Sequence, residues 1–198
     1  MIPAAIPQQA FELIRDQIGA VLAVEIPSQA TLIGDPALNA TVWVERMAPL
    51  TAAELPAINV QTTSGNNDDY GMAHANDTIL YNIDIHVGSK QNATENGDLR
   101  AQRKVQRLLG IVRAILANPR YKNLGFTEPV GYIATRRMTS FQIAEPNSTD
   151  GNYIALARII FEVKAGQCFQ EQDSVPFSEL QTIVTLDETD EGYKFITN

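Results

Sequence analysis

The sequence lacks several features that would point to a particular chemistry or location. Its 198 residues include one cysteine, Cys168, which excludes an internal disulfide and is compatible with a reducing compartment. No apolar run approaches the ~18 residues of a transmembrane helix, and the N-terminus lacks the basic and apolar segments of a signal peptide. We therefore expect a soluble globular protein with no membrane partner.

Catalytic and metal-binding motifs are also missing. His74 and His86 are isolated from each other and from Cys168, so there is no His-Glu-x-x-His or paired-cysteine metal pattern. There is no phosphate-binding loop, dinucleotide-binding fingerprint or nucleophile elbow. Asp84 and His86 share one face of a predicted strand and could form half of a catalytic dyad, or else a polar face or subunit contact. Because no nucleophile motif accompanies them, we expect no catalysis, no cofactor and no metal.

Charge is spread unevenly along the chain. Of its 23 acidic and 15 basic residues, seven acids and one lysine lie in residues 165–198, which leaves 16 acids and 14 bases before them. The sequence therefore predicts a nearly neutral domain at 1–165 and an acidic C-terminal extension at 166–198. Such asymmetry favours an interaction segment, and the lack of a strongly basic domain argues against sequence-specific nucleic-acid binding.

The clearest structural pattern runs from Thr78 to Asn118. Alternation over 78–87 predicts a strand with one buried face, on the side of Ile79, Tyr81, Ile83, Ile85 and Val87. Helical spacing after the next loop predicts an amphipathic helix with a core stripe of Val105, Leu108, Leu109, Val112, Ile115 and Leu116. The opposite side of that helix carries a basic face, which consists of Arg100, Arg103, Lys104 and Arg107.

The remaining patterns complete an α+β fold. They predict a first helix at 8–25, closed by Ile26-Pro27, with Phe11, Ile14, Ile18, Val21 and Leu22 toward the core. Strands are expected at 40–46, 58–62, 131–143 and 153–164, and a long mobile loop at 64–77. The predicted fold is a mostly antiparallel sheet of four to five strands with two helices packed on it, plus a C-terminal extended arm.

Two surface features allow more than one interpretation. Trp43 falls on the outward side of its strand, where either the C-terminal segment or a neighbouring subunit would cover it. The basic face is either solvated or turned toward an anionic surface, which would be DNA or an acidic segment of another subunit, because like charges at helical spacing repel each other. The sequence does not decide between these alternatives.

The order of elements resembles that of the tail-terminator family of long-tailed bacteriophages, small proteins that cap the tail tube at the neck. The resemblance spans about residues 8–165 and is carried by Ala10-Phe11-Glu12-Leu13-Ile14, Val42-Trp43-Val44-Glu45-Arg46-Met47-Ala48-Pro49-Leu50, Leu55-Pro56-Ala57-Ile58-Asn59-Val60, Ile83-Asp84-Ile85-His86-Val87, Ala117-Asn118-Pro119-Arg120-Tyr121 and Ala155-Leu156-Ala157-Arg158-Ile159-Ile160-Phe161-Glu162-Val163. The acidic segment after Ala165 extends past the usual end of that family.

The resemblance implies a hexameric ring with a central channel, an inter-subunit sheet and no enzymatic activity. It implies a virion protein of the tail neck, assembled in the host cytoplasm, with the tail tube protein, the head-tail connector and the sheath protein as partners and DNA passing without sequence readout. On this interpretation the basic face lines the channel or an intersubunit seam, and the interface candidates are Trp43, Asp84, His86, Ile183 and Leu186. The alternatives are another head-tail connector or tail-completion adaptor, a monomeric adaptor that binds peptides at a sheet edge, and a small enzyme using Asp84 and His86.

Overall fold

A computed structural model describes residues 8–70, 74–92, 94–126, 132–149, 152–168, 187–189 and 192–194. The helices are α1 (Ala10–Ile33) and α2 (Gly97–Ala117), with short 3-10 turns at Pro36–Leu38, Ala52–Glu54 and Pro119–Tyr121. The strands are β1 (Thr41–Val44), β2 (Ala57–Tyr70), β3 (His74–Lys90), β4 (Tyr132–Ile143), β5 (Asn147–Thr149), β6 (Asn152–Cys168), β7 (Asp187–Thr189) and β8 (Gly192–Lys194).

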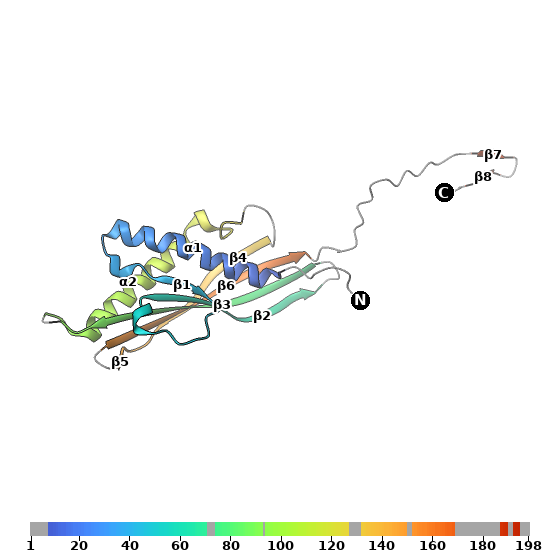
Figure 1. The fold of residues 1–198 in the computed structure, drawn as a ribbon. Helices are drawn as coiled ribbons and strands as arrows, with labels where there is room; N and C mark the ends of the chain where they lie inside the picture. Colours follow the sequence, from blue (N-terminus) through green and yellow to red (C-terminus); the bar gives the residue numbers. More distant parts are fainter. Residues whose placement is uncertain are drawn as a thin grey trace. The chain divides into compact units, whose positions relative to one another are not determined.

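Six of the strands form one mixed sheet, in the order β1-β2-β3-β6-β4, with β5 also paired to β6 (Figure 1). Every pairing in this sheet is antiparallel except that of β1 with β2. These two strands run parallel because the connection over residues 45–56 carries the chain from the end of β1 back to the level of its start. The α+β class with two helices is therefore confirmed. The sheet itself has six strands and one parallel pair, where the sequence predicted four to five mostly antiparallel strands.

Both helices pack on the same face of the sheet (Figure 1). The whole predicted core stripe of α2 is buried, and so are the five inward residues predicted for β3. Four of the five core residues predicted for the first helix are also buried, but Phe11 is 40% exposed. Phe11 lies in the first turn of α1, at the margin of the core, where its carbonyl accepts a hydrogen bond from the buried Tyr81 hydroxyl at 2.9 Å.

Helix α1 continues well past the point where the sequence predicted its end. Pro27 lies inside the helix, which ends at Gly34 in the left-handed conformation that glycine adopts most readily. A proline in a helix interior costs about 3 kcal/mol. Ile26 and Ala30, on either side of it, are both buried in the core, so tertiary packing offsets that cost and carries the helix through the proline.

The predicted loop at 64–77 is also different in the structure. Residues 64–70 extend β2 and residues 74–77 extend β3, and Asp69 and Tyr70 pair with Asn76 and Ala75. The segment is polar and shows no hydrophobic alternation. Backbone pairing, including that of β3 with the end of β6, makes it a strand without a hydrophobic signal.

Strands β7 and β8 pair with each other and belong to a separate unit of the chain. Residues 169–186 lie outside the described part of the structure, and they include the predicted interface residues Ile183 and Leu186.

Candidate functional site

The sheet face away from the helices carries three of the predicted interface residues, Trp43, Asp84 and His86. Along β3, Asp84 and His86 point to this open face, and they lie opposite Arg158 and Leu156 of β6. Asp84, His86 and Leu156 are half-buried, and Arg158 is exposed. Polar and aliphatic side chains therefore alternate across a surface that the two helices leave uncovered.

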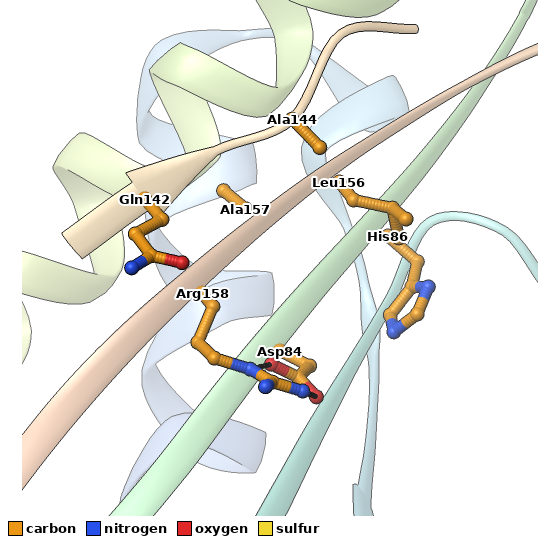
Figure 2. Close-up of a pocket in the computed structure, with 7 residues that line it drawn as sticks. All are labelled: Asp84, His86, Gln142, Ala144, Leu156, Ala157 and Arg158. Carbon is orange, nitrogen blue, oxygen red and sulfur yellow. Dashed lines mark hydrogen bonds and ion pairs between the residues drawn. The ribbon is translucent and has the colours of Figure 1, made fainter. Parts of the chain in front are cut away.

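Asp84 forms a bidentate ion pair with Arg158 across the two strands (Figure 2). Arg158 Nε donates to Asp84 Oδ1 at 2.6 Å and its Nη2 donates to Oδ2 at 2.7 Å. The hydrogen bond to Asp84 raises the pKa of Arg158, because the carboxylate stabilises the charged guanidinium. Both carboxylate oxygens of Asp84 therefore accept hydrogen bonds from Arg158, and no hydrogen bond joins Asp84 to His86.

His86 lies beside this pair and turns away from it (Figure 2). Burial lowers the pKa of His86, an effect that Asp84 opposes and Arg158 reinforces. The two residues line a shallow cavity of about 210 Å³ together with Gln142, Ala144, Leu156, Ala157 and Arg158. None of these seven lining residues carries a hydroxyl, thiol or amine that could act as a nucleophile, so the cavity offers an ion pair and an imidazole and no nucleophile for the imidazole to activate.

The sequence reasoning missed the role of Arg158, which pairs with the candidate Asp84. Its local pattern is a single charged residue between Leu156 and Ile160 on the outward side of β6. That pattern marks Arg158 as a surface residue, but only the register of β3 against β6 identifies Asp84 as its partner.

Trp43 lies on the open side of the sheet, since it pairs in register with Asn59, which itself lies opposite Asp84. The guanidinium carbon of Arg46 lies 4.4 Å from the centre of the indole ring, a cation–π contact. Arg46 also forms an ion pair with Glu54 at 2.7 Å. Its backbone N–H donates to Asn59 Oδ1 at 3.1 Å, and its carbonyl accepts from Asn59 Nδ2 at 2.9 Å. Trp43 is thus contacted by a loop of its own domain, which the sequence did not suggest, and it remains partly exposed.

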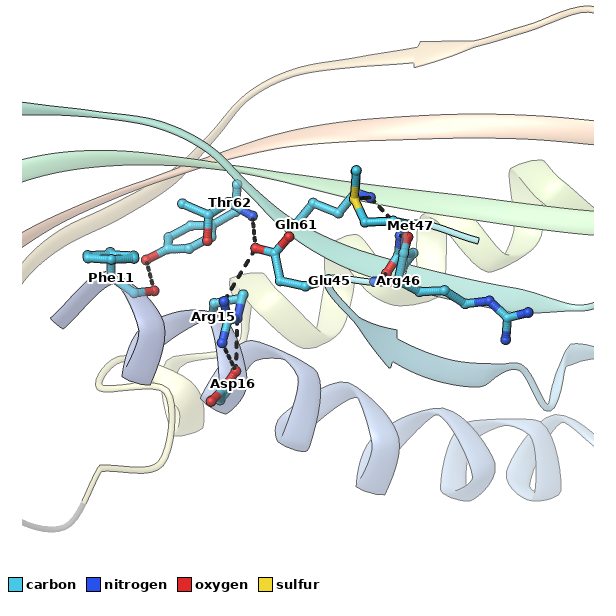
Figure 3. Close-up of polar contacts among 10 residues, drawn as sticks. Phe11, Arg15, Asp16, Glu45, Arg46, Met47, Gln61 and Thr62 are labelled. Atoms are coloured by element: carbon cyan, nitrogen blue, oxygen red, sulfur yellow. Dashed lines mark hydrogen bonds and ion pairs between the residues drawn. The ribbon is translucent and has the colours of Figure 1, made fainter. Parts of the chain in front are cut away.

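The same loop is tied to the first helix by charged side chains (Figure 3). Arg15 of α1 pairs with the neighbouring Asp16 at 2.7 Å and with Glu45 at 3.4 Å. Glu45 also accepts the Thr62 backbone N–H at 2.8 Å, at the point where β1 ends and β2 loses its strand neighbour. Hydrogen bonds from Thr51 and, to a smaller extent, from Arg46 lower the pKa of the Glu54 carboxyl to about 2.

The basic face of α2 is partly neutralised. Glu95, just before the helix, accepts a hydrogen bond from Arg103 and lies 3.9 Å from Arg100. Arg100 also donates to the Lys90 carbonyl at 3.1 Å. Within the described ranges, Lys104 and Arg107 form no ion pair. The repulsion inferred from the sequence is therefore smaller than expected at the helix start and remains along the second half of the face.

The two edges of the sheet differ in length and cover. Strand β4 pairs with β6 on one side, and in the described part of the chain no strand pairs with its other side. Phe141 on β4 is 48% exposed, with the Arg113 guanidinium 4.8 Å from its ring centre. At the opposite edge β1 pairs with the first four residues of β2, and among the described residues no strand pairs with the outer side of β2 after Thr62. An open strand edge of this kind can pair with another chain.

The described residues contain no group of three or more metal-ligating side chains. Among the helices of that same part of the chain, none has the length and apolar content needed to cross a membrane. Comparisons with protein-family models and with curated proteins found no match.

Proposed function

We propose that this chain is a virion structural protein of a long-tailed bacteriophage, a tail-terminator or neck component that closes the tail tube as a ring and joins it to the head connector. The proposal starts from the resemblance in the order of elements. The observation that carries it furthest is the presence of two unlike open edges on one sheet, β4 on one side and the outer side of β2 on the other.

Two unlike edges support a head-to-tail contact between copies. If the β4 edge of one copy pairs with the β2 edge of the next, the two end copies of the series each keep one free edge. Addition of further copies stops only when these two edges meet and a ring closes. The resemblance implies six copies. Such a ring has two different faces, one for the last ring of tail tube protein and one for the connector protein.

In this arrangement the basic face of α2 lines the channel or the seam between neighbours. Lys104 and Arg107 supply positive charge that no ion pair of the described residues offsets. Contacts of this kind to phosphates position DNA without reading its sequence. The acidic residues that follow β6, after Cys168, act as an extended arm that contacts a neighbouring subunit or the sheath protein. The ring assembles in the host cytoplasm and remains in the virion neck.

The decisive experiment measures mass in solution and then the effect of blocking one edge. Light scattering and negative-stain images of the purified protein should reveal rings of six 21.7 kDa chains, about 130 kDa. The register of β4 against β6 shifts at Ala134, which has no partner residue in β6, so Ala134→Pro breaks none of the β4–β6 residue pairs and makes the edge unsuitable for pairing with another strand. Combined with Phe141→Lys, it should leave a folded monomer.

The matched control is Ala134→Ser with Phe141→Leu, which keeps the backbone N–H and an apolar side chain and should still form rings. A wild-type protein that stays at the mass of one chain, both alone and with purified tail tubes, would rule out the ring. Rings that form equally well from both double variants would rule out the β4 edge as the contact.

A further inference from the structure

A second cavity, of about 280 Å³, lies where four segments of the domain meet. Its walls come from the end of β3, the first turns of α2, the loop before β2 and the start of β6. It is separate from the cavity beside Asp84 and His86, with which it shares no lining residue. Two of its lining residues, Arg100 and Lys104, belong to the basic face of α2.

The charge of this cavity is unusual for such an acidic chain. Lys90, Arg100 and Lys104 line it, and no carboxylate does, although the chain carries 23 acidic and 15 basic residues. The acid that accompanies Arg100 is Glu95, which is shared with Arg103. In the described part of the chain neither lysine forms an ion pair, so only Arg100 among the three cations of this cavity has an acidic partner.

The cavity is also built to hold those charges in place. Arg100 donates to the Lys90 carbonyl at 3.1 Å, and its side chain is only 30% exposed, so the guanidinium is anchored before any ligand arrives. Leu55 and Ile154 supply apolar walls, and Asn152 adds an amide. A partly desolvated site strengthens the attraction between fixed cations and an anion.

From this arrangement we propose that the cavity binds a phosphate group. A free phosphate or phosphate monoester carries about 1.5 to 2 negative charges at neutral pH, and a phosphodiester of a nucleic acid backbone carries one. The oxygens of either group can accept hydrogen bonds from one anchored guanidinium and two lysines around a single hollow. An acidic peptide in extended conformation would instead space its same-side carboxylates about 6.6 Å apart and would need a line of cations. The site lies within one protomer, so it does not depend on the proposed ring. The phosphate is either free or part of a nucleic acid backbone.

Isothermal titration calorimetry of the full-length protein tests the site, with inorganic pyrophosphate and a short single-stranded oligothymidylate as probes. The double substitution Lys90→Gln with Lys104→Gln should weaken binding of both probes at least about tenfold, the effect of losing charge-assisted hydrogen bonds. Lys122→Gln, at an exposed lysine outside the cavity, is the matched charge control and should bind as the wild type does. Lys104→Arg should retain binding.

The two probes also identify the source of the phosphate. If the oligonucleotide binds more tightly and the double substitution reduces its salt dependence by about two phosphate contacts, the ligand is a nucleic acid backbone. If pyrophosphate binds at least as tightly, the ligand is a free phosphate compound. No heat of binding with pyrophosphate at millimolar concentration, or equal affinity in the double variant, would overturn the inference. So would tighter binding of a polyglutamate peptide than of either phosphate probe.

Discussion

Truncation of Leu109 measures how much the contact between α2 and the sheet contributes to stability. Leu109 is 4% exposed in the helix stripe that faces the core. Leu109→Ala removes three carbon atoms, worth about 0.8 kcal/mol each in transfer free energy, and leaves part of a cavity. We expect a loss of about 3 kcal/mol in the free energy of unfolding, which for a domain of this size lowers Tm by about 6–12 °C.

Urea denaturation followed by far-UV circular dichroism, together with thermal melts, provides the measurement. The matched control is Leu99→Ala, the same change on the same helix at a side chain that is 45% exposed, which should cost about 1 kcal/mol or less. The reasoning is refuted if the two variants shift the denaturation midpoint equally. It is also refuted if Leu109→Ala costs less than about 1 kcal/mol, because the stripe would then not be the core contact.

Three further sets of substitutions probe packing, pH dependence and the cross-strand ion pair. Gly19→Ala places a methyl group 2.5 Å from a side-chain carbon of β1 and should lower the free energy of unfolding by about 1–3 kcal/mol. Gly110→Ala meets nothing within 4 Å and should raise it by about 0.5–1 kcal/mol. Shifts of Tm with the same sign in both variants would contradict this expectation. Burial lowers the pKa of His86, so the folded state binds its proton less well than the unfolded chain does. The wild type should therefore lose more stability than His86→Gln as pH falls below about 6.5. If the urea midpoints of the two proteins change by the same amount with pH, this effect is excluded. Asp84→Asn should lower the free energy of unfolding by about 1 kcal/mol or less, since its partner Arg158 is half-exposed. A double-mutant cycle with Arg158→Gln should give a non-zero coupling energy, and a coupling energy of zero would mean that the ion pair does not contribute to stability.

Local periodicity by itself determined the elements that have one clearly buried face. The stripe from Val105 to Leu116 and the alternation from Ile79 to Val87 predicted which side chains form the core, and both are buried. The end of α2 was also determined locally, because Asn118 precedes Pro119 and the helix stops at Ala117. These predictions succeed because burial of one face imposes a repeat that is visible in the residues themselves.

Only the tertiary structure decided the features that depend on segments far apart in sequence. Packing of Ile26 and Ala30 carries α1 through Pro27, and pairing with neighbouring strands turns the polar residues 64–70 into a strand. The same holds at the candidate site, where Asp84 meets Arg158 across 74 positions of sequence. Long-range contacts also set the register between strands, the parallel pairing of β1 with β2 and the proximity of Lys90 to the basic face of α2. Such contacts produce no periodic pattern in the local sequence.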